Sequence, residues 1–230
     1  MNRFDMQLGI LPPAQRKLWP HLQPMRTLDF VLYGGTAIAL RLGHRSSVDF
    51  DFFSNAPLDR AALRLALPFL EDARVTQDVS HTYSAVVAVG DEPVTLSFFG
   101  NLHLGRVGTP ELTSDEILQV ASLDDLFAFK LGVVSQRVQA RDYIDIAEIL
   151  RHNLSLEHGL ASAQAIYGTQ FQPAETLKAL TYFEGGDLSI LQEADKEMLR
   201  TEAGRVQTIP IIERSSDFFC SDCDRDGLGR

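Results

Sequence analysis

Two aspartates, Asp49 and Asp51, stand two positions apart in the short apolar run that Val48 begins. Side chains alternate between the faces of a β-strand, so residues i and i+2 point the same way, with Cα atoms about 6.5–7 Å apart. We expect both carboxylates on one face and Val48, Phe50 and Phe52 toward the core. Carboxylates about 4 Å apart repel by roughly 4 kcal/mol at an effective dielectric near 20. A hard cation such as Mg²⁺ (or Mn²⁺), which prefers carboxylate oxygen, would remove that repulsion.

A glycine turn upstream of these aspartates has the chemistry of a phosphate site. Gly34 and Gly35 end an apolar run, residues 30–33, and a helical pattern follows them. Free backbone N–H groups and the positive end of the helix dipole hold phosphate at such a helix start. The glycines let the backbone approach a ligand closely, and Thr36 adds a hydroxyl. A phosphate cradle beside a metal-binding carboxylate pair suits a nucleoside triphosphate (NTP) with its cation.

The loop before Asp49 carries His44 and Arg45. Both side chains are of types that contact phosphate or a base. Both are equally ordinary in a solvated loop, and the sequence leaves the two interpretations open.

Gly34-Gly35, followed about a dozen residues later by Asp49-x-Asp51, resembles the signature of the nucleotidyltransferase superfamily with the DNA polymerase β-like fold. The fuller string GGTAIALRLGHRSSVDFDFF looks like the AbiEii/AbiGii toxin family within it. That family includes abortive-infection and toxin–antitoxin proteins. The resemblance implies an enzyme that transfers a nucleotidyl group from an NTP with a divalent metal.

Polymerase β-like enzymes commonly place a third carboxylate on a later strand. The corresponding segment here, residues 95–99, contains Ser97 and no acid. A lone serine is a poor Mg²⁺ ligand. Either two carboxylates suffice, or a third acid comes from elsewhere, or the protein is a catalytically degenerate module that binds a nucleotide or a partner.

A second group of charged residues lies about eighty positions downstream. Lys130 stands among phenylalanines in a predicted helix, and Asp142 and Asp145 follow Arg141 at i, i+3 spacing in the next helix. Taken alone, this pattern is typical of ion pairs on a helix surface, worth a few tenths of a kcal/mol.

The family resemblance gives these residues a different role. The AbiEii-like form D-L-x-A-x-K…R…R-D-x-x-D matches Asp125 through Asp145, and the resemblance covers roughly residues 28–152. It implies that Lys130 contacts the triphosphate and that Asp142 supports catalysis or the metal. Asp145 and Arg141 are weaker candidates, since Asp145 could serve only to orient an arginine.

The composition limits the function classes. The chain has 230 residues, 45% of them hydrophobic, and a net charge of −10. This balance argues against a protein dominated by a nucleic-acid-binding surface, but leaves room for a local basic patch. The patch we expect to contact RNA consists of Lys130, Arg137, Arg141 and Arg151. No apolar run reaches eighteen residues and the N-terminus lacks a continuous apolar signal region, so we expect a cytoplasmic protein without a membrane span.

The pattern of elements predicts an α/β fold: a small mixed sheet flanked by helices, with a helical C-terminal region. Three alternating runs, residues 74–80, 83–89 and 94–99, should extend the sheet that the aspartate strand begins. Capped helical patterns follow from Ser122 onward.

Three regions follow from this pattern. Residues 1–121 would form a nucleotidyltransferase core, and residues 122–204 a helical region that completes the site and its cleft. The polar tail, residues 205–230, reads as disordered. Its Cys220 and Cys223 form one C-x-x-C pair, too few ligands for a zinc site.

The function we expect is Mg²⁺-dependent transfer of a nucleotidyl group from an NTP to an RNA, such as tRNA, or to a protein hydroxyl. The family resemblance further implies a toxin with a cognate antitoxin protein as partner. A non-enzymatic regulatory protein, with Asp49 and Asp51 as mere surface charge, is the rival interpretation.

Overall fold

The computed structural model describes residues 2–220 and divides into two compact units. The first unit contains the chain up to Ser122 and resumes at Ser216, and the second is Leu123–Ser215. The confirmed fold class is α/β: a mixed sheet with flanking helices in the first unit, and helices in the second.

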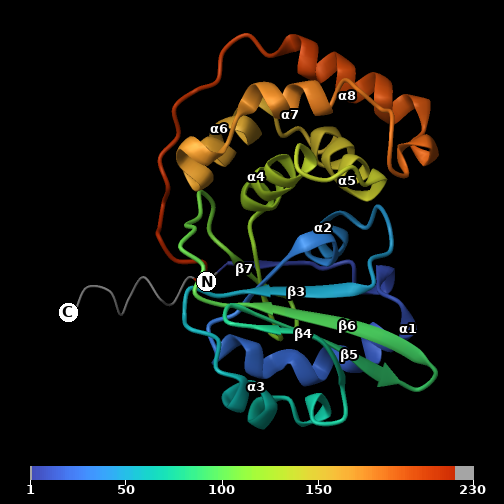
Figure 1. Cartoon of the computed structure of the whole chain (residues 1–230), viewed down its shortest axis with the longest axis vertical. Coiled ribbons are helices and arrows are strands. Elements are labelled where there is room, and N and C mark those ends of the chain that lie inside the picture. Colours follow the sequence, from blue (N-terminus) through green and yellow to red (C-terminus); the bar gives the residue numbers. More distant parts are fainter. Residues whose placement is uncertain (1, 221–230) are drawn as a thin grey trace. The chain divides into compact units, whose positions relative to one another are not determined.

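The first unit is built on an eight-stranded mixed sheet with the order β1-β7-β8-β2-β3-β6-β5-β4 (Figure 1). Its strands are β1 (Arg3–Phe4), β2 (Val31–Tyr33), β3 (Asp49–Phe53), β4 (Arg74–Val79), β5 (Thr82–Val89), β6 (Glu92–Phe99), β7 (Glu111–Thr113) and β8 (Gln119–Val120).

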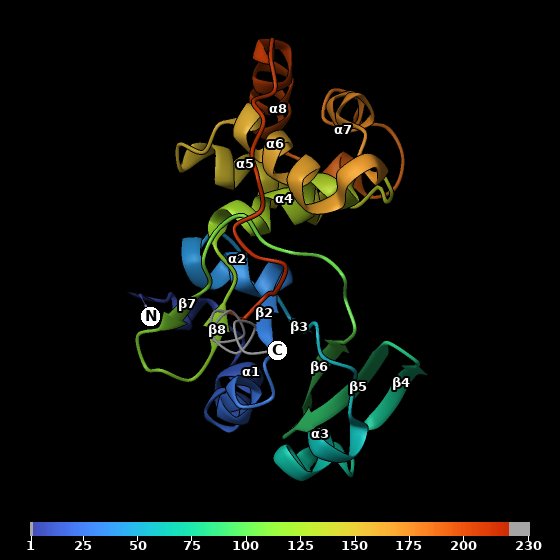
Figure 2. The ribbon, with the colours of Figure 1, turned by 90° about the vertical axis from the view of Figure 1, so that its left-hand side faces the viewer.

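The three strands predicted after the aspartate strand are present as β4, β5 and β6, paired antiparallel in sequence order (Figure 2). Gly90 and Asp91 form the tight turn between β5 and β6, and the positive φ of Gly90, 67°, is a conformation that glycine adopts at little cost. β6 then pairs in parallel with β3. This pairing places the later strands directly beside the two aspartates.

The helices of the first unit cover both faces of this sheet. They are α1 (Pro13–Leu18), α2 (Gly34–Leu42) and α3 (Arg60–Ala66), with 3-10 helices at Leu8–Ile10, Trp19–Arg26 and Pro68–Leu70. Figure 1 shows α2 on one face of the sheet and α1 and α3 on the other. Phe50 and Phe52 are fully buried on the α1 side, where the Trp19 ring lies 6.2 Å from that of Phe50.

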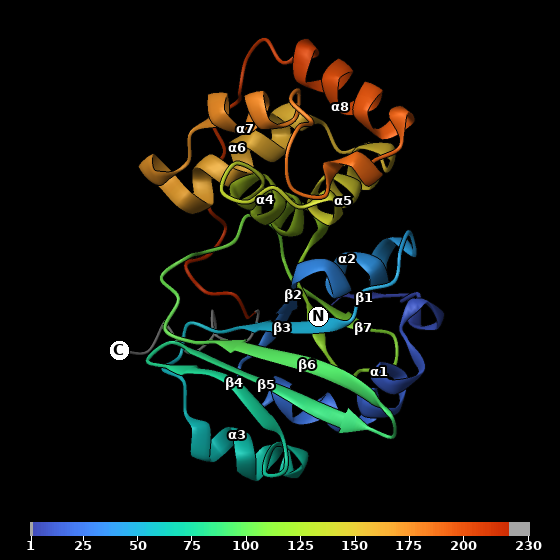
Figure 3. The same cartoon turned by 45° about the vertical axis from the view of Figure 1, so that its right-hand side comes forward.

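The second unit is helical (Figure 3). Its helices are α4 (Leu123–Val134), α5 (Ala140–Arg151), α6 (Leu156–Tyr167), α7 (Pro173–Ala179) and α8 (Glu193–Arg205), with 3-10 helices at Gly168–Gln170 and Leu188–Ile190. Helix α4 packs against α5, α6 and α7. Gly159 permits the close approach of α6 to α4, because a Cβ there would lie 2.5 Å from the Phe127 ring.

Two expectations fail in the first unit. Val48 is 57% exposed and precedes β3 rather than facing the core, because strand pairing begins at Asp49. The predicted disorder of the tail does not hold for residues 216–220, since Phe219 and Cys220 are buried. Cys223 and the rest of the tail, residues 221–230, lie outside the described residues.

Candidate functional site

The first candidate site, which we call the sheet cluster, consists of Gly34, Asp49, Asp51 and Ser97. Asp49 and Asp51 are half-buried on one face of β3, while Phe50 between them is fully buried on the other. The predicted alternation is therefore present. Two carboxylates on one face form an oxygen donor set of the kind that hard divalent cations prefer.

Gly34 brings the start of α2 against one of these carboxylates. Its φ is +74°, and a Cβ built on it would lie 2.3 Å from Oδ2 of Asp51. Both the backbone conformation and the close approach require glycine. The first turn of α2, with its free N–H groups and positive dipole end, is therefore in contact with the Asp51 side chain. The residues fit a metal–phosphate site, because cation ligands and a phosphate-binding helix start adjoin each other.

Arg45 lies against the next residue of the glycine turn. A Cβ at Gly35 would be 2.7 Å from Nη2 of Arg45 and 3.1 Å from Oγ of Ser47. The guanidinium thus stands at the first turn of α2, with Nη1 donating to the Ser46 carbonyl at 3.0 Å. This placement favours the phosphate-contact interpretation of Arg45 over that of a solvated loop. His44, in the same loop, is half-buried.

Thr36 makes a structural hydrogen bond within the sheet cluster. Its side chain is fully buried, and its hydroxyl donates a hydrogen bond to the backbone carbonyl of Asp49. The hydroxyl therefore ties the beginning of β3 to the first turn of α2. This bond helps to hold the sheet cluster together, and the phosphate contact predicted for Thr36 stays a prediction.

Ser97 occupies the position beside Asp51 on the neighbouring strand. The β3–β6 register pairs Asp51 with Ser97 and Asp49 with Thr95. Ser84 of β5 donates its hydroxyl to that of Ser97 at 3.1 Å. The hydroxyls of Ser84 and Ser97 thus occupy the strand position at which a third carboxylate would be expected. Within residues 2–220, no group of three or more His, Cys, Asp or Glu side chains is arranged to hold a metal ion.

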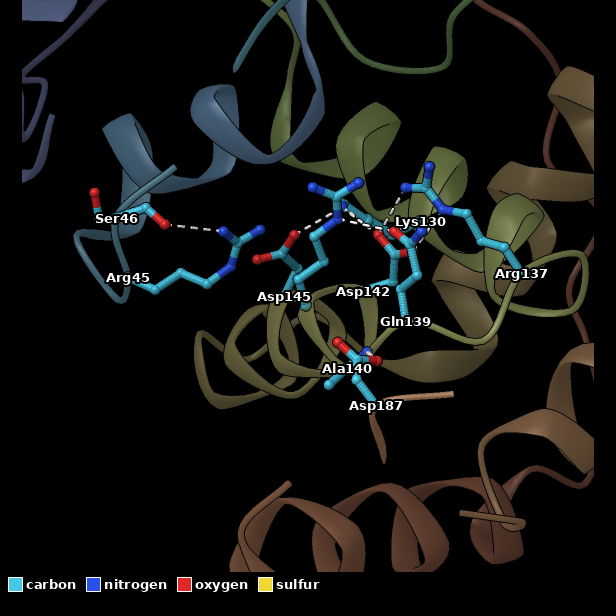
Figure 4. Close-up of polar contacts among 10 residues, drawn as sticks. Arg45, Ser46, Lys130, Arg137, Gln139, Ala140, Asp142, Asp145 and Asp187 are labelled. Carbon is cyan, nitrogen blue, oxygen red and sulfur yellow. Dashed lines mark hydrogen bonds and ion pairs between the residues drawn. The ribbon is translucent and has the colours of Figure 1, made fainter. Parts of the chain in front are cut away.

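The second candidate site, which we call the helix-pair cluster, joins α4 to α5 and the loop between them. It consists of Lys130, Arg137, Asp142 and Asp145. Nζ of Lys130 lies 2.6 Å from Oδ1 of Asp142 and 2.7 Å from Oδ2 of Asp145. Arg137 approaches Asp142 with Nε 2.8 Å from Oδ2 and Nη2 3.0 Å from Oδ1 (Figure 4). Each oxygen of Asp142 therefore accepts a charge-assisted hydrogen bond.

Lys130, Asp142 and Asp145 of this cluster are buried, so the surface ion-pair interpretation is wrong for them, whereas Arg137 is exposed. Asp142 and Asp145 are fully buried, and Lys130 is 6% exposed. Burial raises the pKa of Asp142, but the hydrogen bonds and charges of Arg137 and Lys130 outweigh it and hold that pKa below its ordinary value. Asp142 is therefore held as a carboxylate at neutral pH.

One member of the predicted basic patch, Lys130, is buried and is therefore not part of an exposed surface. Lys130 and Arg137 are paired with the buried aspartates. Arg151 pairs with Glu148 at 3.1 Å and with Asp195. Arg141 donates to the Gln139 side chain at 2.9 Å. Arg137, Arg141 and Arg151 are exposed, and the RNA contact predicted for them stays a prediction.

The comparison with known families decides the relationship. Residues 26–205 match the family described as "Nucleotidyl transferase AbiEii toxin, Type IV TA system". The chain belongs to the AbiEii family. The resemblance read from Gly34 to Asp51 is confirmed, and this AbiEii protein is a nucleotidyltransferase by family.

The chain is also similar to a curated relative in sequence and to two solved structures in fold. An uncharacterized protein of Aquifex aeolicus (strain VF5) is 25% identical over 174 residues, which cover 73% of this chain and 80% of the relative. The nucleotidyltransferase toxin MenT4 of Mycobacterium tuberculosis H37Rv shares the fold with a TM-score of 0.59 at 13% identity, covering 85% of this chain and 84% of MenT4. A candidate nucleotidyltransferase from H. pylori gives 0.57 at 18% identity, covering 83% and 92%.

Two site neighbours, Ser84 and Phe219, have no role in the sequence interpretation, and a third, Arg137, has a contact beyond the one expected. Ser84 supports Ser97 across the β5–β6 pair, and Arg137 supports Asp142 from the α4–α5 loop. Phe219 packs against the aromatic residues that flank the sheet cluster. The strand pairing could have suggested Ser84, and the family pattern contains Arg137, whereas no local pattern marks Phe219. The helices of residues 2–220 include none long and apolar enough to cross a bilayer.

Proposed function

We propose that this AbiEii protein transfers a nucleotidyl group from an NTP to the hydroxyl of an acceptor, with Mg²⁺ bound at the sheet cluster. The observation that carries the proposal is the contact of Gly34 with Asp51. It joins a two-carboxylate face to the N-terminal turn of a nine-residue helix.

Different residues at the sheet cluster would bind the cation and the phosphates of an NTP. Asp49 and Asp51 would hold the cation, which when bound offsets triphosphate charge and activates the attacking hydroxyl. The backbone of Gly34 and Gly35 would cradle phosphate, and the Arg45 guanidinium at the same helix start would neutralise it.

The helix-pair cluster would supply the second set of charges. We propose that Lys130 stabilises the triphosphate during transfer, as the AbiEii pattern implies. Asp142 and Asp145 would hold its ammonium group in one place, since each lies within 2.7 Å of it. A preorganised cation stabilises developing charge better than a mobile one.

Ser97 supports a second candidate function. Where a third carboxylate would complete a two-metal site, this chain has a hydroxyl bonded to Ser84. A degenerate member that binds an NTP without turning it over would have this arrangement. The assay below separates the two candidates, since binding without label transfer identifies the degenerate protein.

The acceptor we propose is an RNA end, with tRNA as the first to test and a protein hydroxyl as the other outcome. The membership of a toxin family adds two proposals: the activity slows growth of the host, and an antitoxin encoded with the chain counteracts it. With a net charge of −10, RNA contact should depend on the divalent cation, because carboxylates alone repel phosphate.

The test is incubation of the full chain with each labelled NTP in turn, Mg²⁺ and total RNA, with and without protein from the host. Asp49→Asn and Asp51→Asn each remove one carboxylate of the pair. Asp91→Asn removes one from the exposed β5–β6 turn and serves as the matched control.

We expect label on the acceptor with the wild type and with Asp91→Asn, and a loss of at least about 100-fold with either site variant, of the order seen when one electrostatic stabiliser is removed. Transfer that persists in both site variants would rule out the sheet cluster as the active site. Equal growth of cells expressing wild type and Asp49→Asn, at matched soluble levels, would remove the toxin proposal.

A further inference from the structure

The C-terminal segment Ser216–Cys220 returns to the first unit after the chain has completed the second. It lies beyond residues 26–205, the part that matches the AbiEii family. Phe219 is fully buried and Cys220 is 2% exposed, whereas the preceding residue, Phe218, is 39% exposed. The segment therefore buries the Phe219 ring in the first unit, while the Phe218 ring stays partly exposed to solvent.

Backbone hydrogen bonds fix this segment in place. Arg106 and Ser216 form a bridge in which the Arg106 N–H donates to the Ser216 carbonyl at 2.9 Å. Asn55, two residues after β3, accepts from the Phe219 N–H at 2.7 Å and donates to the Asp217 carbonyl at 3.1 Å. A side-chain amide that binds the backbone on both sides of Phe218 sets the direction of the Phe219 ring.

The Phe219 ring lies on two aromatic residues. Its centroid is 5.3 Å from that of Tyr33 at 76°, and 5.9 Å from that of Phe53 at 71°. Tyr33 and Phe53 stack on each other at 4.7 Å and 9°. Edge-to-face and stacked pairs at these separations are attractive beyond the area they bury.

These aromatic residues lie on the face of the sheet that carries the aspartates. Phe53 is two residues beyond Asp51 on β3, so it points to the same side. Tyr33 of β2 pairs directly with Asp51, and paired residues share a face. Tyr33 also immediately precedes Gly34, whose backbone contacts the Asp51 carboxylate. A shift of Tyr33 would therefore move Gly34 relative to Asp51.

We propose that Ser216–Cys220 is a clasp that positions the sheet cluster. Phe219, seated on Tyr33 and Phe53, holds the strand-to-helix turn against Asp51 and so preserves the geometry for the divalent cation. Phe219 is a positioning residue, since it acts through Tyr33. This inference rests on the proposed metal site at Asp49 and Asp51.

The experiment measures Mn²⁺ binding to the full chain without nucleotide, by the electron paramagnetic resonance of free Mn²⁺, and amide hydrogen exchange of residues 31–35. Phe219→Ala removes the ring, Phe219→Leu keeps an apolar side chain, and Phe218→Ala is the matched control one residue away. Melting curves establish that each variant is folded. Supporting groups around metal ligands typically change metal affinity by 10–100-fold, so we expect on the order of tenfold weaker Mn²⁺ binding for Phe219→Ala.

The supporting result is weaker Mn²⁺ binding and faster exchange at residues 31–35 in Phe219→Ala, an intermediate effect in Phe219→Leu, and wild-type behaviour in Phe218→Ala. Unchanged or tighter Mn²⁺ binding in folded Phe219→Ala overturns the clasp, and if that variant does not fold, the same criterion applies to Phe219→Leu. Failure of the wild type to bind Mn²⁺ would instead count against the proposed metal site. The amide exchange would then test the clasp by itself: exchange rates at residues 31–35 that are the same in Phe219→Ala as in the wild type would overturn it.

Discussion

Replacement of Lys130 by methionine tests whether the helix-pair cluster depends on its central cation. Methionine keeps an unbranched, largely apolar side chain and removes the charge. In the wild type Nζ of Lys130 lies 2.6 Å from Asp142 and 2.7 Å from Asp145, and both carboxylates are fully buried. We expect the Lys130→Met variant to lose about 3–5 kcal/mol of unfolding free energy, the usual cost of leaving a buried ion partner uncompensated.

The magnitude follows from two opposing contributions. At an effective dielectric near 20, each contact contributes roughly 6 kcal/mol of attraction, and desolvation of the buried ions offsets much of that sum. Counting Lys130 and Arg137 as +1 and the two aspartates as −1 each, the cluster charge is zero, and it becomes −1 in the variant. A second substitution, Asp145→Asn, restores a neutral cluster. We therefore expect the double variant to recover more than half of the lost stability.

Urea unfolding followed by far-ultraviolet circular dichroism measures these differences, because the second unit is helical. Lys178→Met, at an exposed position on α7, is the control and should change stability by no more than about 0.5 kcal/mol. A loss below about 1 kcal/mol for Lys130→Met would refute the reasoning, as would a double variant no more stable than the single one. Transferase activity of any Lys130 variant has to be expressed per folded molecule.

Three further outcomes follow from the same contacts. Gly34→Ala should lose about 1–2 kcal/mol in urea unfolding because of its positive φ, and should bind Mn²⁺ more weakly because its Cβ meets Asp51; wild-type Mn²⁺ affinity would contradict this. Thr36→Val should lose about 1–2 kcal/mol through loss of the hydrogen bond to the Asp49 carbonyl, whereas Thr36→Ser should lose less; equal losses would argue against the hydroxyl. The lowered pKa of Asp142 contributes stability that is present above its unfolded pKa, about 3.9, and lost as pH falls through the folded value; melting temperatures of Asp142→Asn should lack this acid-side fall.

The strand–turn–helix–strand order around Asp49 could be predicted because its signals are local. Within about twenty residues, the sequence contains an apolar run, two glycines and a helical pattern that ends at Gly43. The facing of Asp49 and Asp51 followed from strand alternation alone. The expectation for Val48 is wrong because the start of β3 depends on its pairing with β6. That pairing begins at Asp49, and the periodicity of the sequence does not reveal where it begins.

The helix-pair cluster could not be predicted from its own spacing. The i, i+3 separation of Asp142 and Asp145 says that they share a helix face, but not whether that face is buried. The answer depends on Lys130 of the preceding helix and on Arg137 of the loop, whose contacts form only when α4 packs on α5. Phe219 was missed for a similar reason, since a polar, turn-rich tail gives no local sign that one aromatic ring is buried against β2 and β3.

The two pairs of aspartates have different chemistry although their residue types are identical. A general base works best when its pKa lies near the working pH. Asp142 has both oxygens bonded to cationic donors and a pKa below the ordinary value, so it is a weak base at neutral pH. This favours a role in which Asp142 fixes Lys130, and it disfavours the alternative in which Asp142 takes the acceptor's proton. Under the proposed function, the acceptor hydroxyl would instead be activated at the proposed metal site of Asp49 and Asp51.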